Sequence, residues 1–332
     1  MDLDAFSAVH SASWQRLDDL SRRRRLSGAE SDELVALYQQ VATHLSAVRS
    51  AAPDPSVVSH LSDLLARARA AIAGAHDPSW SDLARFFAVV LPAAFYRVRW
   101  WTVGVTVAFC LVATVAGFTM YHDPSAQAAF GTPAELRLYA EQQFASYYTQ
   151  YDGSSFAAQV WTNNAWIAAQ CVAFGISGIW PVYVLLSNAV NVGAAGGVMA
   201  LHDGLDIFFQ LILPHGLMEL TAIFVAGGAG LKLFWTVVDP AGRPRSRAVA
   251  EEGRSLITVA LGLVVVLGVS GLVEGFVTPS TVLPWWLKIA IGAVVLAAYW
   301  AYVLTLGRRA SREGETGDLG QEERGDALPT AA

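Results

Sequence analysis

The segment PHGLMEL, residues 214–220, places a histidine and a glutamate four residues apart inside an apolar stretch. Residues with this spacing lie on one face of an α-helix, so His215 and Glu219 can act together. Such groups are costly in hydrocarbon and usually face the interior of a bundle or a wet cavity. The segment therefore predicts a polar contact inside a membrane-embedded bundle.

His215 and Glu219 allow three kinds of chemistry. They can form a structural contact between helices, line a path for a small solute or ion, or bind a metal that activates water. The third would make the protein an intramembrane hydrolase with His202, His215 and Glu219 as candidate zinc ligands. Zinc proteases usually carry two histidines four residues apart around a glutamate, and here a glutamate takes the second position. We therefore expect no catalytic residue, metal or other cofactor.

Other polar residues interrupt the apolar segments in the same way. By predicted depth most of them fall in the outer half of the membrane, which indicates one polar cavity opening outward. Gly216 allows a close helix contact, and Pro214 predicts that a spanning helix starts there, with residues 206–213 as a short interfacial or re-entrant piece. The predicted polar cluster comprises Asn163, Asn164, Asn188, Asn191, His202, Pro214, His215, Gly216, Glu219 and Glu274.

Composition identifies the elements that must position this cluster. The 332 residues are 54% hydrophobic and only 15% charged, which is typical of an integral membrane protein. The sequence contains no basic domain that would indicate binding of nucleic acid. We predict an all-α, polytopic bundle with about six transmembrane helices of the length that a bilayer requires. The predicted spans are residues 100–121, 161–179, 183–201, 214–235, 255–277 and 285–306.

The remaining segments predict the domain organisation. Residues 1–82 have the pattern of a small helical domain, and residues 83–99 that of an amphipathic juxtamembrane helix. The transmembrane domain, residues 100–306, includes an outer amphipathic loop at 122–160 and a cytoplasmic loop at 237–253. The acidic tail, residues 307–332, is expected to be disordered. The distribution of arginines predicts a multi-pass protein with both termini in the cytoplasm.

The PHGLMEL segment, the two asparagines of WTNNAW and the NAVNVGAAGG segment together resemble the stage II sporulation protein M family over roughly residues 80–306. The namesake of that family helps to assemble a peptidoglycan-degrading complex during engulfment and is not itself the hydrolase. Many relatives in non-sporulating bacteria are encoded beside AAA+ ATPases and proteins with von Willebrand-type domains. The long N-terminal domain here departs from the shorter sporulation members, so the engulfment role does not transfer directly.

The resemblance implies a non-catalytic scaffold or assembly factor of the bacterial plasma membrane, linked to cell-envelope processes. Its expected contacts are membrane lipids and proteins on both faces, among them an AAA+ ATPase or a von Willebrand-type domain protein, and a homo-oligomer is a further possibility. The alternative is a transporter or channel for a small solute or ion with an outward-facing polar cavity. The third hypothesis is an intramembrane metal-dependent hydrolase.

Overall fold

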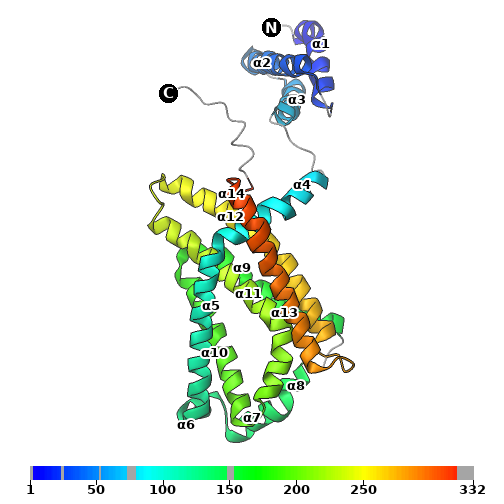
Figure 1. Ribbon diagram of the computed structural model, residues 1–332. Coiled ribbons are helices and arrows are strands. Elements are labelled where there is room, and N and C mark those ends of the chain that lie inside the picture. Colours follow the sequence, from blue (N-terminus) through cyan, green and yellow to red (C-terminus); the bar gives the residue numbers. More distant parts are fainter. Residues whose placement is uncertain (1–2, 24–25, 52–53, 73–79, 148–152, 320–332) are drawn as a thin grey trace. The chain divides into compact units, whose positions relative to one another are not determined.

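A computed structural model of the chain describes residues 3–23, 26–51, 54–72, 80–147 and 153–319, with residues 153–157 described through their backbone alone. The chain divides into two compact units, Met1–Asp82 and Leu83–Ala332. The described residues form helices and no strand, which confirms the all-α class (Figure 1).

The first unit is a three-helix bundle of α1 (Leu3–Ser21), α2 (Gly28–Ala51) and α3 (Pro55–Ile72). Ser27 and Glu30 exchange hydrogen bonds before α2 in a capping box, and the Asp54 carboxylate accepts from the first amides of α3. Each helix contributes one apolar stripe to a shared core. The fully buried members of this core include Leu17, Leu20, Val41, Val48, Leu61 and Leu64.

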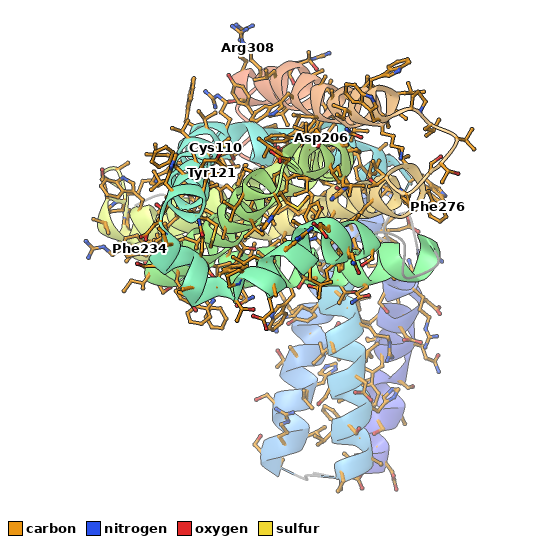
Figure 2. The ribbon with its side chains drawn as sticks, turned by 90° about the horizontal axis from the view of Figure 1, so that it is seen from below. Cys110, Tyr121, Asp206, Phe234, Phe276 and Arg308 are labelled. Carbon is orange, nitrogen blue, oxygen red and sulfur yellow. The ribbon has the colours of Figure 1, made fainter. Side chains whose placement is uncertain are left out.

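Five helices among the described residues of the second unit are long and apolar enough to cross a membrane. They are Trp80–His122, Ile179–Leu201, Leu205–Val238, Arg245–Val277 and Trp285–Arg312. Many large apolar side chains project outward from this unit, as lipid contact requires, and Figure 2 shows Phe276, which is 57% exposed, at one edge. The protein is therefore a multi-pass membrane protein.

The predicted span 161–179 corresponds to α9 (Gly153–Ala173), which is not among these five helices. Helix α9 carries Asn163, Asn164 and Gln170, and a short 3-10 turn, η3 (Gly175–Ser177), joins it to α10 (Ile179–Leu201). It nevertheless packs against α10, α11 and α12 within the bundle. These polar residues, of which Asn163 and Asn164 belong to the predicted polar cluster, set the composition of α9 apart from that of its neighbours.

The segment predicted as a separate juxtamembrane helix at 83–99 is continuous with the first span. Helix α4 (Trp80–Arg85) leads through a π-helical turn, η1 (Phe86–Val90), into α5 (Leu91–His122). Pro92 comes directly after this π-helical turn, so the backbone hydrogen bond that proline cannot make falls where the α-helical pattern is already interrupted. Leu91, Phe95 and Val98 are buried in the main core, so this part of the helix packs on protein and does not lie on a surface.

Helix α11 (Leu205–Val238) contacts α5, α9, α10, α12 and α13, and its residues 221–230 are all buried. Pro214 lies inside this helix, so the predicted helix start at Pro214 and the separate piece at 206–213 are wrong. A proline removes one backbone hydrogen bond, and membrane helices tolerate that loss where neighbouring elements cover the site. Here Gly292 of α13 (Trp285–Tyr302) packs directly on the Pro214 carbonyl.

Glycines let the helices approach closely. A Cβ added at Gly193 of α10 would lie 2.1 Å from the Ala113 carbonyl oxygen of α5, and one at Gly230 would lie 2.3 Å from the Cys171 carbonyl oxygen of α9. Such backbone-to-backbone contact is how small residues stabilise helix pairs in lipid. The bundle is consequently packed tightly around α11.

The outer loop predicted at 122–160 is folded into short helices. These are α6 (Pro124–Phe130), α7 (Pro133–Leu138), the π-helical turn η2 (Tyr139–Gln143) and α8 (Phe144–Tyr147). Leu136, Ala140 and Phe144 are buried against Met199 and Phe208 of α10 and α11. The amphipathic pattern thus reflects packing on the neighbouring helices. Residues 148–152 lie outside the described part.

Two predictions for the opposite end of the bundle are wrong. Helix α12 (Arg245–Leu272) begins directly after residues 239–244, so most of the predicted loop 237–253 is helical. Residues 307–319 of the predicted disordered tail are also ordered on the bundle. A π-helical turn, η5 (Val303–Gly307), joins α13 to α14 (Arg308–Arg312), and Asp318 is buried in an ion pair with Arg254. Composition alone predicts disorder here because it does not reveal a partner for the acidic groups, and residues 320–332 of the predicted tail lie outside the described part.

Candidate functional site

A histidine and two glutamates meet inside the bundle, on α11 and on the π-helical turn η4 (Val273–Val277) that ends α12. His215 and Glu219 lie one turn apart on α11, and Glu274 comes from η4. The His215 Nε2 atom is 3.5 Å from Glu274 Oε1 and 3.9 Å from Glu219 Oε2. All three side chains are buried, at 5%, 11% and 3% exposure in that order.

The local backbone explains how Glu274 reaches α11. A π-helical turn holds an extra residue per turn and thereby shifts the side chains that follow an α-helix, which is why such turns recur at functional sites. Both Glu274 and Gly275 of η4 are buried against the bundle. The i,i+4 spacing of His215 and Glu219 then completes the cluster from the other helix.

Neighbouring polar groups hold the histidine in place. Its Nδ1 lies 3.2 Å from Thr278 Oγ1, and its backbone carbonyl accepts a hydrogen bond from Ser270 Oγ. The Thr278 carbonyl in turn accepts a hydrogen bond from Lys288 Nζ at 2.7 Å. The ring is therefore oriented from its Nδ1 side, and Nε2 faces the two carboxylates.

One polar atom of this cluster has no hydrogen-bond partner. Glu274 Oε2 is buried without one, and neither Glu219 nor Glu274 pairs with a lysine or arginine of the described chain. A buried carboxylate oxygen without a donor is costly, so a proton or a cation is the group that this arrangement needs.

The other residues of the predicted polar cluster are distributed over the bundle. His202 caps the C-terminal end of α10, and it is not a member of the His215–Glu219–Glu274 group. Its Nε2 is buried without a partner. The candidate ligand set His202, His215 and Glu219 is accordingly not the one that the structure brings together, because Glu274 takes the third position.

The hydrogen bonds of the predicted asparagines go to partners outside this group. Asn164 is buried and its side-chain oxygen accepts a hydrogen bond from Asn163, which lines an open cavity of about 670 Å³ with Tyr147, Gln159 and Trp166. None of the three cluster residues lines that cavity. Asn188 donates to the Val184 carbonyl of its own helix, and Asn191 is exposed. Gly216, next to His215, is buried.

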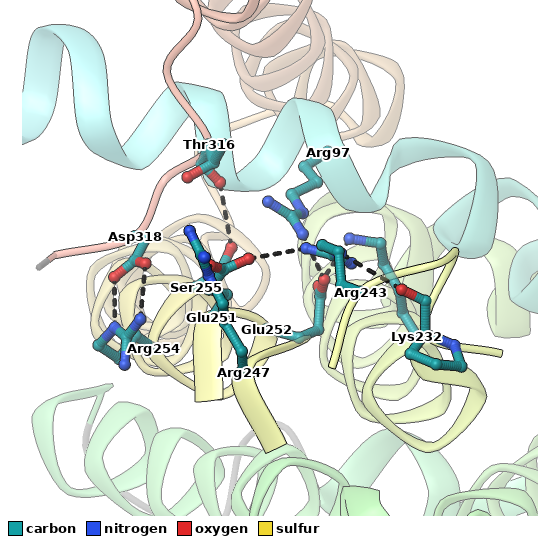
Figure 3. Close-up of polar contacts among 11 residues, drawn as sticks. Arg97, Lys232, Arg243, Arg247, Glu251, Glu252, Arg254, Ser255, Thr316 and Asp318 are labelled. Atoms are coloured by element: carbon teal, nitrogen blue, oxygen red, sulfur yellow. Dashed lines mark hydrogen bonds and ion pairs between the residues drawn. The ribbon is translucent and has the colours of Figure 1, made fainter. Parts of the chain in front are cut away.

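A second charged cluster, which the sequence analysis missed, lies at the other end of α11 and α12. Glu252 forms ion pairs of 2.6 Å with both Arg97 and Lys232, and its side chain is only 4% exposed (Figure 3). Nearby, Arg254 forms a bidentate ion pair with Asp318. The available signal was Lys232, one of two lysines in the chain, which stands inside an apolar run.

These features define a polytopic α-helical membrane protein with a buried histidine–carboxylate cluster. The family model described as Stage II sporulation protein M matches residues 106–279. The chain belongs to this family, which confirms the resemblance seen in its sequence. The match covers α9 to α12 and with them all three cluster residues.

Other comparisons extend this result. A second model, described as a domain of unknown function, matches residues 4–74 of the three-helix unit. An uncharacterized protein from Methanocaldococcus jannaschii is similar over 122 residues at 26% identity, covering 36% of this chain and 68% of the relative. No solved structure matches the chain.

Proposed function

We propose that the protein is a non-catalytic membrane scaffold that recruits partners through its N-terminal helical unit and its outer helices. The observation that carries this proposal is the modular construction of the chain. A three-helix unit with its own core and its own family match precedes a bundle that matches a different family. A soluble module joined to a membrane bundle suits a protein that gathers others at the membrane.

The packing of the bundle supports a structural role. Glycines place the backbones of α5, α9, α10 and α11 in direct contact, which favours one fixed arrangement of helices. We further propose that both termini lie in the cytoplasm of a bacterial cell. The Arg85–Glu315 ion pair joins the start and the end of the bundle, and Arg243, Arg245 and Arg247 lie at the α11–α12 connection.

By family resemblance, the proposed partners are an AAA+ ATPase or a protein with a von Willebrand-type domain. Affinity purification from native membranes in mild detergent tests this proposal, with the full chain compared with a variant that lacks residues 1–82. We expect such a partner with the full chain and its loss with the truncated chain. Recovery of the same partners with both chains, or of no specific partner with either, would contradict it.

A transporter is the second candidate, favoured by the buried cluster, because ionisable groups inside membrane helices often mark ion pathways. Glu219→Gln separates the two proposals. A scaffold keeps its partners in this variant, since the N-terminal unit is unchanged. A transporter loses ion or solute uptake into vesicles while still assembling.

A further inference from the structure

The three side chains of the buried cluster have the composition of a metal site. His215 offers an imidazole nitrogen, and Glu219 and Glu274 each offer a carboxylate oxygen, with all three atoms within 4.8 Å of one another. Ligands of a tetrahedral zinc ion with bonds of about 2.1 Å stand roughly 3.4 Å apart. The observed 3.5 and 3.9 Å between Nε2 and the two carboxylates come close to that spacing.

The charge of the cluster also calls for a cation. Two buried carboxylates offer oxygens within 4.8 Å of each other, and no described lysine or arginine forms an ion pair with either of them. Of the two lysines, Lys288 donates to the Thr278 carbonyl and Lys232 pairs with Glu252. A divalent cation would balance the negative charge of both glutamates. It would coordinate a carboxylate oxygen of Glu274, either the unpartnered Oε2 or Oε1.

The surroundings of His215 match those of a metal-bound histidine. Such a histidine usually gives its second ring nitrogen to a hydrogen-bond partner that fixes the ring and its tautomer. Thr278 Oγ1 takes this position at Nδ1, which leaves the Nε2 lone pair directed at the carboxylates. The hydrogen bond from Ser270 to the His215 carbonyl fixes the backbone of the same residue.

We propose that His215, Glu219 and Glu274 bind one divalent transition-metal ion, with zinc as the best match to one imidazole and two carboxylates. Three protein ligands leave a further position for water. The ion would fasten α11 to η4 inside the bundle. This inference does not depend on the scaffold proposal, since a metal that joins two helices is compatible with any role of the bundle.

The test uses the full chain, purified in detergent without metal-affinity resin, and quantifies bound metals by mass spectrometry. We expect about one zinc, iron or manganese ion per chain in the wild type. Glu219→Gln and Glu274→Gln preserve side-chain volume and should reduce bound metal at least about tenfold. His202→Gln is the matched control, because this histidine lies outside the cluster, and it should keep the metal.

A second measurement keeps the test decisive if a variant folds poorly. Zinc added to chelator-treated wild type should raise its Tm, because a ligand that binds only the folded state stabilises it. Magnesium should not, since it rarely uses imidazole. Wild type that contains no transition metal and gains no stability from zinc, iron or manganese would overturn the proposal in favour of a proton shared between the carboxylates. Metal retained in both glutamine variants would overturn it as well.

Discussion

The two charged clusters on α11 and α12 solve the same physical problem in different ways. Next to the α11–α12 connection, Glu252 is held by two cations, Arg97 and Lys232, and these three residues form the Glu252 cluster. At the other end, Glu219 and Glu274 face one histidine and no lysine or arginine of the described chain. Lys232 comes 17 residues after His215, which corresponds to roughly 26 Å along the helix, so the clusters are independent. Buried charge within one bundle can thus be balanced by protein side chains or left for a bound ion.

The largest loss of stability is expected at the Glu252 cluster. Glu252→Gln leaves the half-buried Arg97 and Lys232 without their carboxylate, and losing one partner of a buried ion pair costs about 3–5 kcal/mol. Thermal unfolding in detergent should show a large fall in Tm. Glu141→Gln is the control, because Glu141 pairs with Arg137 at an exposed site and should change Tm little. Equal stability of the two variants would show that the ion pairs of Glu252 contribute no more than an exposed pair.

Asp318→Asn should have an intermediate effect. This side chain is 3% exposed and forms a bidentate ion pair with Arg254, which is itself 37% exposed. Allowing for that exposure, we expect a loss of about 1–2 kcal/mol. Limited proteolysis should then cut residues 313–319 faster than in the wild type. Unchanged proteolysis would show that Asp318 does not hold residues 313–319 on α12.

His44 in the N-terminal unit provides a reference for a histidine buried without carboxylates. Its Nδ1 accepts a hydrogen bond from Trp14 Nε1, and burial, with a smaller effect of His10, lowers the pKa of His44 below 6.5. The unfolded chain therefore binds a proton more readily, so stability is present above about pH 6.5 and is lost as the pH falls through that value.

Circular dichroism of fragment 1–82 at pH 7.5 and 5.5 measures this effect, which we expect to be a modest fall in Tm at the lower pH. His44→Gln should reduce the pH response, whereas His60→Gln, at an exposed position, should preserve it. A response that is equal in both variants would assign it to other groups.

The smallest effect is expected for Glu274→Gln in chelator-treated protein. Because Glu274 has no cationic partner, removing its charge should cost less than about 1 kcal/mol, in contrast to Glu252→Gln. Thermal unfolding of both variants under identical conditions measures the difference. A loss at Glu274 as large as that at Glu252 would contradict the comparison.

Sequence patterns predicted the parts of this protein that depend on local periodicity. Apolar runs indicated the membrane helices, and the i,i+4 rule placed His215 and Glu219 on one face. The contact with Glu274 depends on a π-helical turn about 55 residues further along, which no spacing rule reveals. The predicted helix start at Pro214 was wrong because tertiary packing with Gly292 overrides the usual preference of proline for helix starts.

The Glu252 cluster and the ordered tail could not be predicted for a related reason. Arg97, Lys232 and Glu252 come from three helices, and Arg254 and Asp318 are 64 residues apart. An acidic, glycine-containing tail has the composition of a disordered segment until a buried partner for its carboxylates is known. Long-range charge pairing, unlike helix periodicity, leaves no mark in the local sequence.

The most direct test of the central claim is X-ray absorption at the zinc edge, measured on zinc-loaded wild type and Glu274→Gln at equal protein concentration. In the wild type we expect the zinc ion to be surrounded by nitrogen and oxygen ligands at about 2.0–2.2 Å. This signal should be lost in the variant. No bound zinc in the wild type, a shell containing sulfur, or an identical shell in both proteins would contradict the claim that the His215–Glu219–Glu274 cluster is balanced by a metal ion.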